Sequence, residues 1–148
     1  MFEALFSTDT GIAALLLRLT LGLVIFPHGA QKLLGWYGGY GWNGTMGFFS
    51  SMGIPRVFGA AAILTESVGA LLLVAGAGTR LVALAIGVTM LVAALKVHRN
   101  VGFFMNWGGT LKGEGYEYHI LVVGMVIALL VLGGGAFSVD GLIAARLR

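Results

Sequence analysis

Residues 15–36 read LLLRLTLGLVIFPHGAQKLLGW, and this stretch decides the fold. It is apolar and long enough to cross the ~30 Å hydrocarbon core of a bilayer as a helix of ~20 residues. It also carries Arg18 inside the apolar run and His28 and Lys32 near its end. A charge at that depth costs about 2.5 kcal/mol or more unless it faces a helix-bundle interior and is paired. The stretch therefore predicts a transmembrane helix with an inner face that needs polar partners.

The composition of the whole chain is that of a membrane protein. Of its 148 residues, 58% are hydrophobic and 10% are charged, and the mean hydropathy is +0.95. A soluble domain is usually about 25% charged. The net charge of +3 comes without a basic run, so we expect the lipid bilayer, and no nucleic acid, as a partner. The chain has no cysteine, which excludes disulfides, thiol redox chemistry and cysteine-ligated metal clusters.

Four apolar segments of about 20 residues organise the chain. They lack the alternation typical of strands, and helices satisfy their own backbone polar groups in lipid. We therefore predict an all-α fold, a four-helix transmembrane bundle that forms a single domain over residues 1–148. Ser138 is placed to N-cap a short C-terminal interfacial helix that begins after the last segment. The predicted transmembrane helices cover residues 11–34, 57–77, 81–97 and 116–134.

The connections between the segments predict which residues share a membrane surface. The sequence GAGT joins the second and third segments as a tight hairpin, whereas the other two connections are long and rich in glycine and aromatic residues. With four crossings, both long loops lie on one side, and the termini and the hairpin lie on the other. Aromatic residues are typical of loops at the membrane interface.

Two charged residues fall inside the apolar segments. Arg18 and Glu66 each lie on a helical stripe of small residues, and small residues let helices approach closely in membranes. We expect the two side chains to interact, directly or through water or a bound ligand. The alternative is a structural ion pair that only fixes the register of the helices.

The same topology brings the three histidines of the chain to the side of the long loops. His28 closes the first helix, His98 closes the third, and His119 opens the fourth beside Tyr118. Together with the charges above, these positions give the candidate ligand-binding set: Arg18, His28, Lys32, Glu66, His98 and His119.

Several chemistries are compatible with this cluster. Histidine, lysine and tyrosine donors can bind the carbonyl oxygens of a quinone headgroup, and histidine and carboxylate can pass protons. Two histidines can ligate a haem iron, and three can hold zinc or copper, although the sequence has no regular ligand spacing such as HxH or HxxxH. The remaining alternative is side chains that extend to the lipid headgroups without any ligand.

Four motifs in order resemble the DoxX family of small four-helix bacterial membrane proteins. They are RLTLGLVIFPHGAQKLLGW from Arg18, LTESVGALLLVAGAGTRL around Glu66, KVHRNVGFF from Lys96 and EGYEYHILVVGMVIALLVLGGGAFSVDGLI from Glu114. The chain has GGG at residues 133–135, where many members have a Gly-Pro-Gly turn. The positions that match the family motif are Arg18, His28, Lys32 and Glu66.

The resemblance implies a multi-pass protein of the bacterial inner membrane that is associated with oxidoreductases. One relative forms the large subunit of a thiosulfate:quinone oxidoreductase. We therefore expect a membrane component that binds a quinone-like electron carrier and works with a soluble partner enzyme. The alternative is a non-catalytic scaffold, an assembly factor or a small-solute permease. A homodimer is compatible with the sequence, but no motif specifies one.

Overall fold

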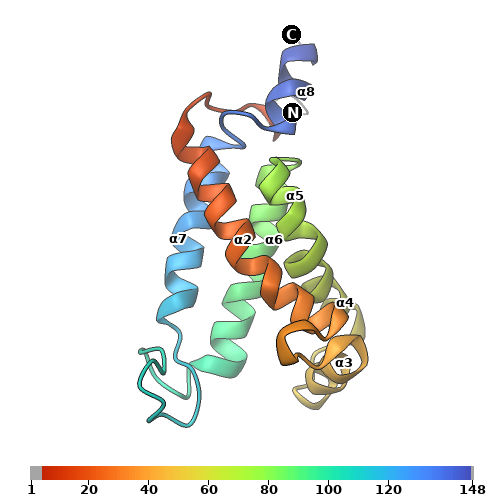
Figure 1. Cartoon of the computed structure of the whole chain (residues 1–148), viewed down its shortest axis with the longest axis vertical. Helices are drawn as coiled ribbons and strands as arrows, with labels where there is room; N and C mark the ends of the chain where they lie inside the picture. The colour runs from red at the N-terminus through yellow and green to blue at the C-terminus, as the bar shows by residue number, and fades with distance from the viewer. Residues whose placement is uncertain (1–4, 148) are drawn as a thin grey trace.

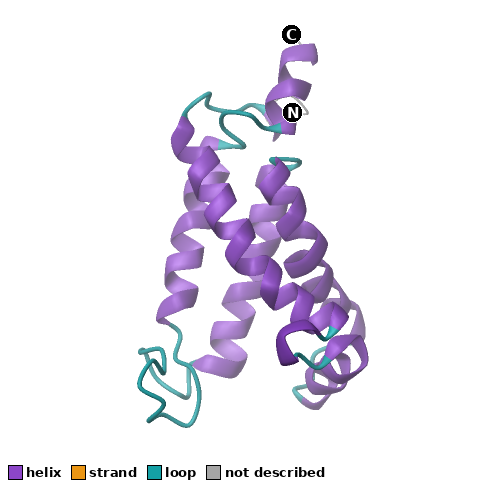
Figure 2. Cartoon of the chain, in the orientation of Figure 1, coloured by secondary structure: helices purple, strands orange, loops and turns teal. Residues whose placement is uncertain are grey.

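The computed structural model describes residues 5–147 and shows an all-α protein (Figures 1 and 2). It is 73% helical, and no strand occurs within the described range. The helices pack side by side along the long axis of the molecule (Figure 1). Their bounds are Ile12–Leu34 (α2), Trp36–Gly38 (η1), Gly41–Ser51 (α3), Arg56–Leu64 (α4), Thr65–Gly69 (η2), Ala70–Ala75 (α5), Thr79–Ala93 (α6), Ala94–His98 (η3), Glu117–Leu132 (α7) and Val139–Leu147 (α8).

Within residues 5–147, three helical segments are long and apolar enough to cross a membrane, and we call them the first, second and third rod in chain order. They comprise α2 with 23 residues, α4–η2–α5 with 20 and α6–η3 with 20, and their mean hydropathies are between 1.8 and 2.1. The fourth apolar helix, α7, is shorter and has 16 residues. All four lie where the sequence predicts helices, with bounds that differ by a few residues at most. Large apolar side chains such as Leu23 and Val131 are 63% and 72% exposed, as expected for surfaces that face lipid.

The two ends of the bundle differ in the way that the sequence predicts. At the terminal end lie the beginning of α2, the α5–α6 hairpin and α8 (Figure 1). At the loop end lie α3 and the connection of residues 99–116 (Figure 1). The hairpin turns on Gly76 and Gly78, whose φ angles of 67° and 61° fall in the left-handed region that favours glycine.

Small residues bring α2 against the second rod. Gly22 and Gly29 are both buried on α2, on the stripe that the sequence predicts to face the interior. A Cβ atom on Gly22 would lie 2.8 Å from the carbonyl oxygen of Ala70. A Cβ atom on Gly29 would overlap the backbone of Glu66 and Ser67. Glycine at these positions therefore allows a backbone-to-backbone approach that any side chain would prevent.

The first long connection contains a helix that the sequence pattern does not predict. Residues Gly41–Ser51 form α3, which buries Thr45 and Met46. Its sequence, GWNGTMGFFSS, contains three glycines, and glycine disfavours helix by about 0.8–1.0 kcal/mol relative to alanine. Packing explains the helix, since the Sδ atom of Met46 lies 3.2 Å from the position of a Cβ on Gly59 of α4. Tertiary contacts, and not intrinsic propensity, stabilise α3.

The C-terminal helix begins as predicted, with Ser138 as its cap. The Ser138 hydroxyl accepts a hydrogen bond from the backbone N–H of Gly141 at 3.1 Å. Asp140 lies in the first turn of α8, but its carboxylate accepts hydrogen bonds from the N–H groups of Gly78 and Thr79 at 2.7 and 2.8 Å. Asp140 therefore caps the beginning of α6 from another element of the chain.

Replacing Asp140 with Ala is expected to lower the free energy of unfolding by about 1–3 kcal/mol, because it leaves one buried and one partly buried backbone donor without an acceptor. Asp140 is 1% exposed, so water does not replace the lost acceptor easily. Thermal unfolding in detergent measures the effect. Asp140→Asn retains one acceptor oxygen, so its stability should fall between those of Asp140→Ala and the parent protein. Equal stability of Asp140→Ala and the parent protein would contradict the capping role.

Candidate functional site

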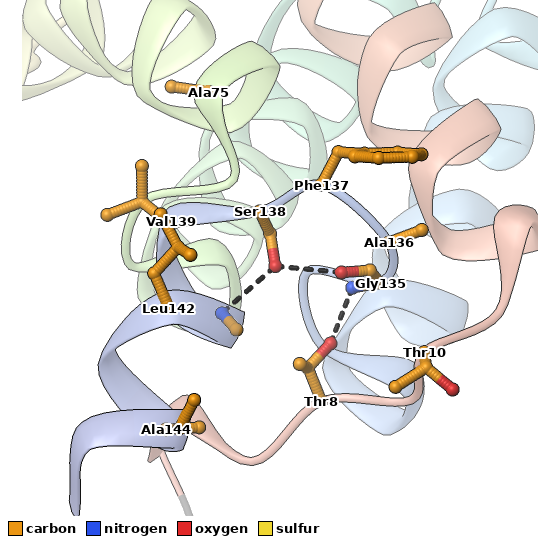
Figure 3. A pocket seen from close by; sticks show the side chains of 12 residues that line it. Thr8, Thr10, Ala75, Gly135, Ala136, Phe137, Ser138, Val139, Leu142 and Ala144 are labelled. Carbon is orange, nitrogen blue, oxygen red and sulfur yellow. Dashed lines mark hydrogen bonds between the residues drawn. The ribbon is translucent and has the colours of Figure 1, made fainter.

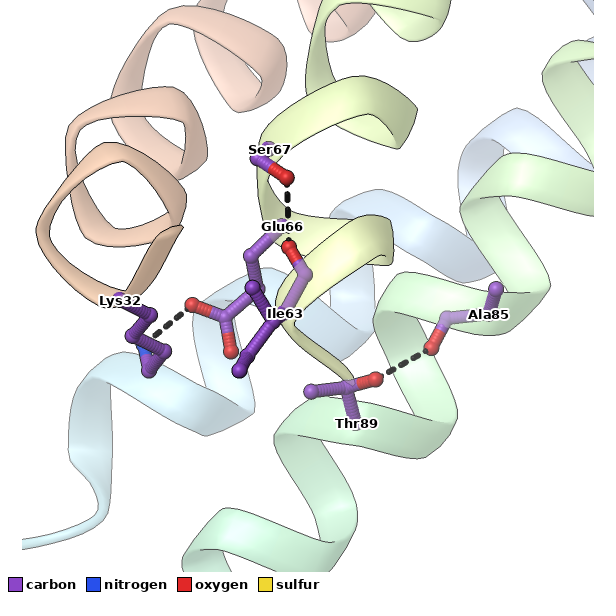
Figure 4. A network of polar contacts seen from close by, with 6 residues as sticks. All are labelled: Lys32, Ile63, Glu66, Ser67, Ala85 and Thr89. Carbon is purple, nitrogen blue, oxygen red and sulfur yellow. Dashed lines mark hydrogen bonds and ion pairs between the residues drawn. The ribbon is translucent and has the colours of Figure 1, made fainter. Parts of the chain in front are cut away.

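A partly buried ion pair joins the end of α2 to the middle of the second rod. The Lys32 ammonium group contacts the Glu66 carboxylate (Figure 4). The Glu66 side chain is 4% exposed, whereas the Lys32 side chain is 28% exposed. Lys32 therefore connects a carboxylate in the interior to the surface of the bundle near the loop end.

The backbone around Glu66 is a π-helical turn. The segment η2 carries Glu66 and Ser67, and the Ser67 hydroxyl donates a hydrogen bond to the carbonyl of Ile63 at 2.7 Å (Figure 4). Single π turns inside α-helices occur frequently at functional sites. Gly29 packs directly against this turn, so the position of Glu66 depends on a close contact between two helices.

Two histidines from different helices lie ring against ring at the loop end, with their planes tilted by 42°. The ring centroids of His98, on η3, and His119, on α7, are 4.4 Å apart. His98 Nδ1 lies 2.7 Å from the carbonyl oxygen of Glu114, and a carbonyl only accepts, so this nitrogen carries the hydrogen. His119 is 7% exposed, whereas His98 is only partly buried.

Tyr118 links the histidine pair to the ion pair. Its ring centroid lies 5.6 Å from that of His119 and 6.2 Å from that of His28. His28 lies one turn before Lys32 on α2, so Tyr118 lies between the histidine pair and the end of α2 that carries the ion pair. We use the name loop-end cluster for these six residues: His28, Lys32, Glu66, His98, Tyr118 and His119.

Two buried polar atoms of the loop-end cluster have no hydrogen-bond partner among residues 5–147. They are the hydroxyl of Tyr118 and Nδ1 of His119. A buried polar group without a partner costs about 1–3 kcal/mol, so such atoms in native proteins usually bind water or a ligand. The cluster therefore offers a hydroxyl, an imidazole nitrogen, an ammonium group and a carboxylate to a bound molecule.

The expected contact between Arg18 and Glu66 is wrong. The guanidinium group of Arg18 instead donates to four backbone carbonyls at the terminal end of the bundle. Nε donates to Gly134 at 2.8 Å, one terminal nitrogen donates to Val74, and the other donates to Ala136 and Phe137 at 3.0 and 2.8 Å. Arg18 is 2% exposed and belongs to a structural network away from the loop-end cluster.

The geometry of helices explains this correction. Side chains on a helix lean toward its N-terminus, which for α2 lies at the terminal end. The last carbonyls of the second rod and the turn after α7 lack intrahelical donors there, and a guanidinium group can serve several of them at once. Lys32, at the other end of α2, is the cation that reaches Glu66.

The structure thus brings together five of the six candidate residues of the sequence analysis and separates Arg18 from them. It also adds Tyr118 to them. The sequence could have indicated this residue, because Tyr118 directly precedes His119 at the start of α7. Within residues 5–147, no three His, Cys, Asp or Glu side chains are arranged to hold a metal ion.

A cavity of about 580 Å³ lies at the opposite end of the molecule, between α8 and the segment before α2 (Figure 3). Thr8 and Ser138 contribute hydroxyl groups to its wall, and both hydroxyls already form hydrogen bonds (Figure 3). The Thr8 hydroxyl accepts from the backbone N–H of Gly135. The Ser138 hydroxyl donates to the carbonyl of Gly135 and accepts from the N–H of Gly141. Phe137 and Leu142 supply apolar surface. None of the histidines lines this cavity, so it is separate from the loop-end cluster.

Two comparisons with known proteins found sequences that are similar to this chain. The chain is 29% identical over 118 residues to "Putative oxidoreductase CatD" of Bacillus subtilis (strain 168), an alignment that covers 80% of this chain and 78% of that protein. No solved structure shows a significant match. Residues 13–99, more than half of the sequence, match the model of the DoxX family, with the predicted Arg18, His28, Lys32 and Glu66 all inside the matched region. The chain is a member of the DoxX family.

Proposed function

We propose that the protein is a four-helix transmembrane bundle of a bacterial inner membrane, in which α7 makes the fourth crossing. With 16 residues, α7 spans ~24 Å, and a bilayer accommodates a short helix by local thinning. An even number of crossings is consistent with two long connections at one end of the bundle and with the start of α2 and the helix α8 at the other (Figure 1).

We infer that the loop-end cluster binds a quinone-like, lipid-soluble electron carrier. The observation that carries this proposal is the polar content of the cluster: the buried Glu66 carboxylate with its Lys32 partner, and two buried atoms, the hydroxyl of Tyr118 and Nδ1 of His119, that have no hydrogen-bond partner within residues 5–147. A quinone presents carbonyl oxygens, which need donors, and its reduced form presents hydroxyl groups, which need acceptors. The cluster contains both kinds of group inside an apolar bundle.

Quinone chemistry also explains why ionisable groups are kept inside the bundle. Conversion of a quinone to a quinol takes up two electrons and two protons. Histidine, tyrosine and carboxylate groups hold and move protons at such sites. A soluble oxidoreductase partner would exchange the electrons with the carrier, because cysteine and its redox chemistry are absent from this chain. On this proposal the protein is the membrane component of a two-part oxidoreductase system.

Binding of duroquinone to the purified protein tests the proposal. We expect duroquinone to raise the unfolding temperature in mild detergent, since a ligand at 100 times its Kd stabilises a protein by about 2.7 kcal/mol. Lys32→Met should abolish this stabilisation, because it removes the ammonium group of the cluster. Lys96→Met removes a lysine that is exposed at the same end, and it should leave the stabilisation unchanged.

Glu66→Gln separates the proposed function from the alternative, a scaffold in which the ion pair only fixes the register of the helices. The variant keeps the shape of the side chain but removes its charge. A folded Glu66→Gln protein that no longer responds to duroquinone supports a ligand site. A parent protein that contains no extractable quinone and shows no response to duroquinone or menadione would favour the scaffold.

A further inference from the structure

All tryptophan and tyrosine residues of the chain belong to the loop end of the bundle (Figure 1). They fall within residues 36–42 and 107–118. Four of them are between 52% and 88% exposed, namely Trp36, Tyr37, Tyr40 and Trp107. Tryptophan and tyrosine are enriched at membrane–water interfaces, because each combines an apolar ring with a polar N–H or O–H group. The loop end therefore carries the side chains that place a protein surface at the level of the lipid headgroups.

Four cations without partners lie at the same end of the molecule. All four are exposed, and within residues 5–147 no hydrogen bond or ion pair engages their side chains. The exposed carboxylate at this end is Glu114, which already accepts a backbone hydrogen bond at 2.6 Å. The loop end thus has an excess of free positive charge. The four cations are Arg56 at the start of α4, Lys96 in η3, and Arg99 and Lys112 in the second long connection.

The connection of residues 99–116 holds its cations and aromatic side chains in a folded segment. Three backbone hydrogen bonds of 2.9–3.2 Å pair residues 102–104 with residues 115–117. Nearer the tip, the Asn106 side chain bonds both the N–H and the carbonyl of Leu111, at 2.9 and 3.0 Å. A folded segment loses less conformational freedom on binding than a flexible one does. The cations of this connection are therefore prepared to meet an anionic surface.

The terminal end of the bundle has no comparable surface among residues 5–147. Arg18 and Arg80 both lie there, but each guanidinium group donates to four backbone carbonyls. Arg146 on α8 is exposed and has no partner within the described range, and the exposed carboxylate of Asp9 offsets its charge. A guanidinium group that carbonyls already occupy is not free to bind an anion. Free positive charge is therefore concentrated at the loop end.

We propose that the loop end binds the headgroups of anionic phospholipids and therefore faces the cytoplasmic side of the membrane. Anionic lipids give the cytoplasmic leaflet a negative surface potential that attracts lysine and arginine, and cytoplasmic connections carry an excess of these residues. An acidic protein surface would also attract four cations. The exposed tryptophan and tyrosine side chains at the same end favour lipid headgroups as the partner.

This orientation places the partly exposed Lys32 and His98 of the loop-end cluster on the cytoplasmic side. A soluble partner enzyme in the cytoplasm would reach them there. The crossing of the bilayer rests on the proposed four-helix bundle, whereas the contact with anionic lipid does not depend on quinone binding.

Quenching of tryptophan fluorescence by brominated lipids tests the lipid contact, because every tryptophan of the chain lies at the loop end. The protein is reconstituted in phosphatidylcholine vesicles that contain either brominated phosphatidylglycerol or brominated phosphatidylcholine. We expect a preference for phosphatidylglycerol of about fivefold or more, which is the ratio that one lysine or arginine near an anionic surface provides. Sodium chloride at about 1 M should abolish most of this preference, because it shortens the Debye length to about 3 Å.

A variant that carries Arg56→Gln, Lys96→Gln, Arg99→Gln and Lys112→Gln should lose the preference. Arg146→Gln is the matched control, since it removes a free cation at the terminal end, and it should leave the preference unchanged. The salt dependence of the parent protein tests the same contact without any substitution. Equal quenching by the two lipids in the parent protein would overturn the lipid contact and would favour an acidic protein as the partner of the four cations.

Single cysteines report the orientation, because the chain has no cysteine of its own. Thr110→Cys marks the loop end and Ala145→Cys marks α8, and both residues are exposed. We expect a membrane-impermeant maleimide to label Thr110→Cys in inverted inner-membrane vesicles and Ala145→Cys in spheroplasts. Labelling of Thr110→Cys in spheroplasts would overturn the proposed orientation, wherever Ala145→Cys is labelled. Labelling of both cysteines from one side would contradict the crossing by α7 and therefore the proposed bundle.

Discussion

Replacing Arg18 with Met is expected to lower the free energy of unfolding by at least about 3 kcal/mol. The guanidinium group is 2% exposed and donates to four backbone carbonyls that lie at the ends of the second rod and of α7. Each hydrogen bond to a charged group contributes about 1.5–3 kcal/mol, and carbonyls left unpaired in a membrane protein cannot turn to bulk water. Chemical or thermal unfolding in detergent measures the loss.

The control for Arg18→Met is Arg56→Met, since Arg56 is exposed at the start of α4. Arg56→Met should leave stability within about 0.5 kcal/mol of the parent protein, as is usual for surface substitutions. Arg18→Lys keeps the charge but not the planar set of donors, and it should recover only part of the stability. The folded fraction of Arg18→Lys should still bind duroquinone. A stable Arg18→Met protein that has lost duroquinone binding would instead show that Arg18 belongs to the ligand site.

Replacing Gly29 with Ala is expected to destabilise the protein by about 3 kcal/mol. An added Cβ would overlap the backbone of Glu66 and Ser67, and a backbone inside a packed rod cannot move aside as a flexible side chain can. Overpacking in a well-packed core typically costs about 1–3 kcal/mol, and the upper end applies where backbone opposes the new atom. The same shift would separate Lys32 from Glu66, so duroquinone binding should weaken as well.

Gly124→Ala provides the matched control for Gly29→Ala. Gly124 lies inside α7, and an added Cβ there meets no atom within 4 Å. Alanine is favoured over glycine in a helix interior by about 0.8–1.0 kcal/mol, so Gly124→Ala should be neutral or stabilising. Equal stability of the Gly29→Ala and Gly124→Ala proteins would show that α2 and η2 do not approach as closely as described.

The positions of the apolar helices follow from the sequence because the bilayer is a strong constraint. A run of about 20 apolar residues has few alternatives in lipid, and short or long connections then set which ends lie together. The stripe of small residues on α2 likewise predicts its buried face. The helix α3 does not follow, because its glycine-rich sequence has a weak helical signal and depends on contacts with α4.

For the polar residues of the site, too, the sequence predicts some positions and leaves others open. The topology brings His28, His98 and His119 to the loop end, as the sequence predicts. It does not predict the partner of Glu66, because both Arg18 and Lys32 lie on the inner face of α2. Gly29 packs against the backbone of Glu66, so Lys32 lies within about one turn of that level, whereas Arg18 lies about three turns before it. The sequence does not give this register between the two helices, and it therefore leaves both pairings open.

The sequence by itself determined that this chain is an all-α membrane protein and that its histidines gather near the long connections, because hydrophobic length and connection length act over whole segments. Only the tertiary structure decided that Lys32 pairs with Glu66, that Arg18 donates to backbone carbonyls at the terminal end, and that Asp140 caps α6. Those pairings depend on the direction of individual side chains and on where helix ends leave carbonyls and N–H groups without partners. Such details arise only when the helices have packed against one another.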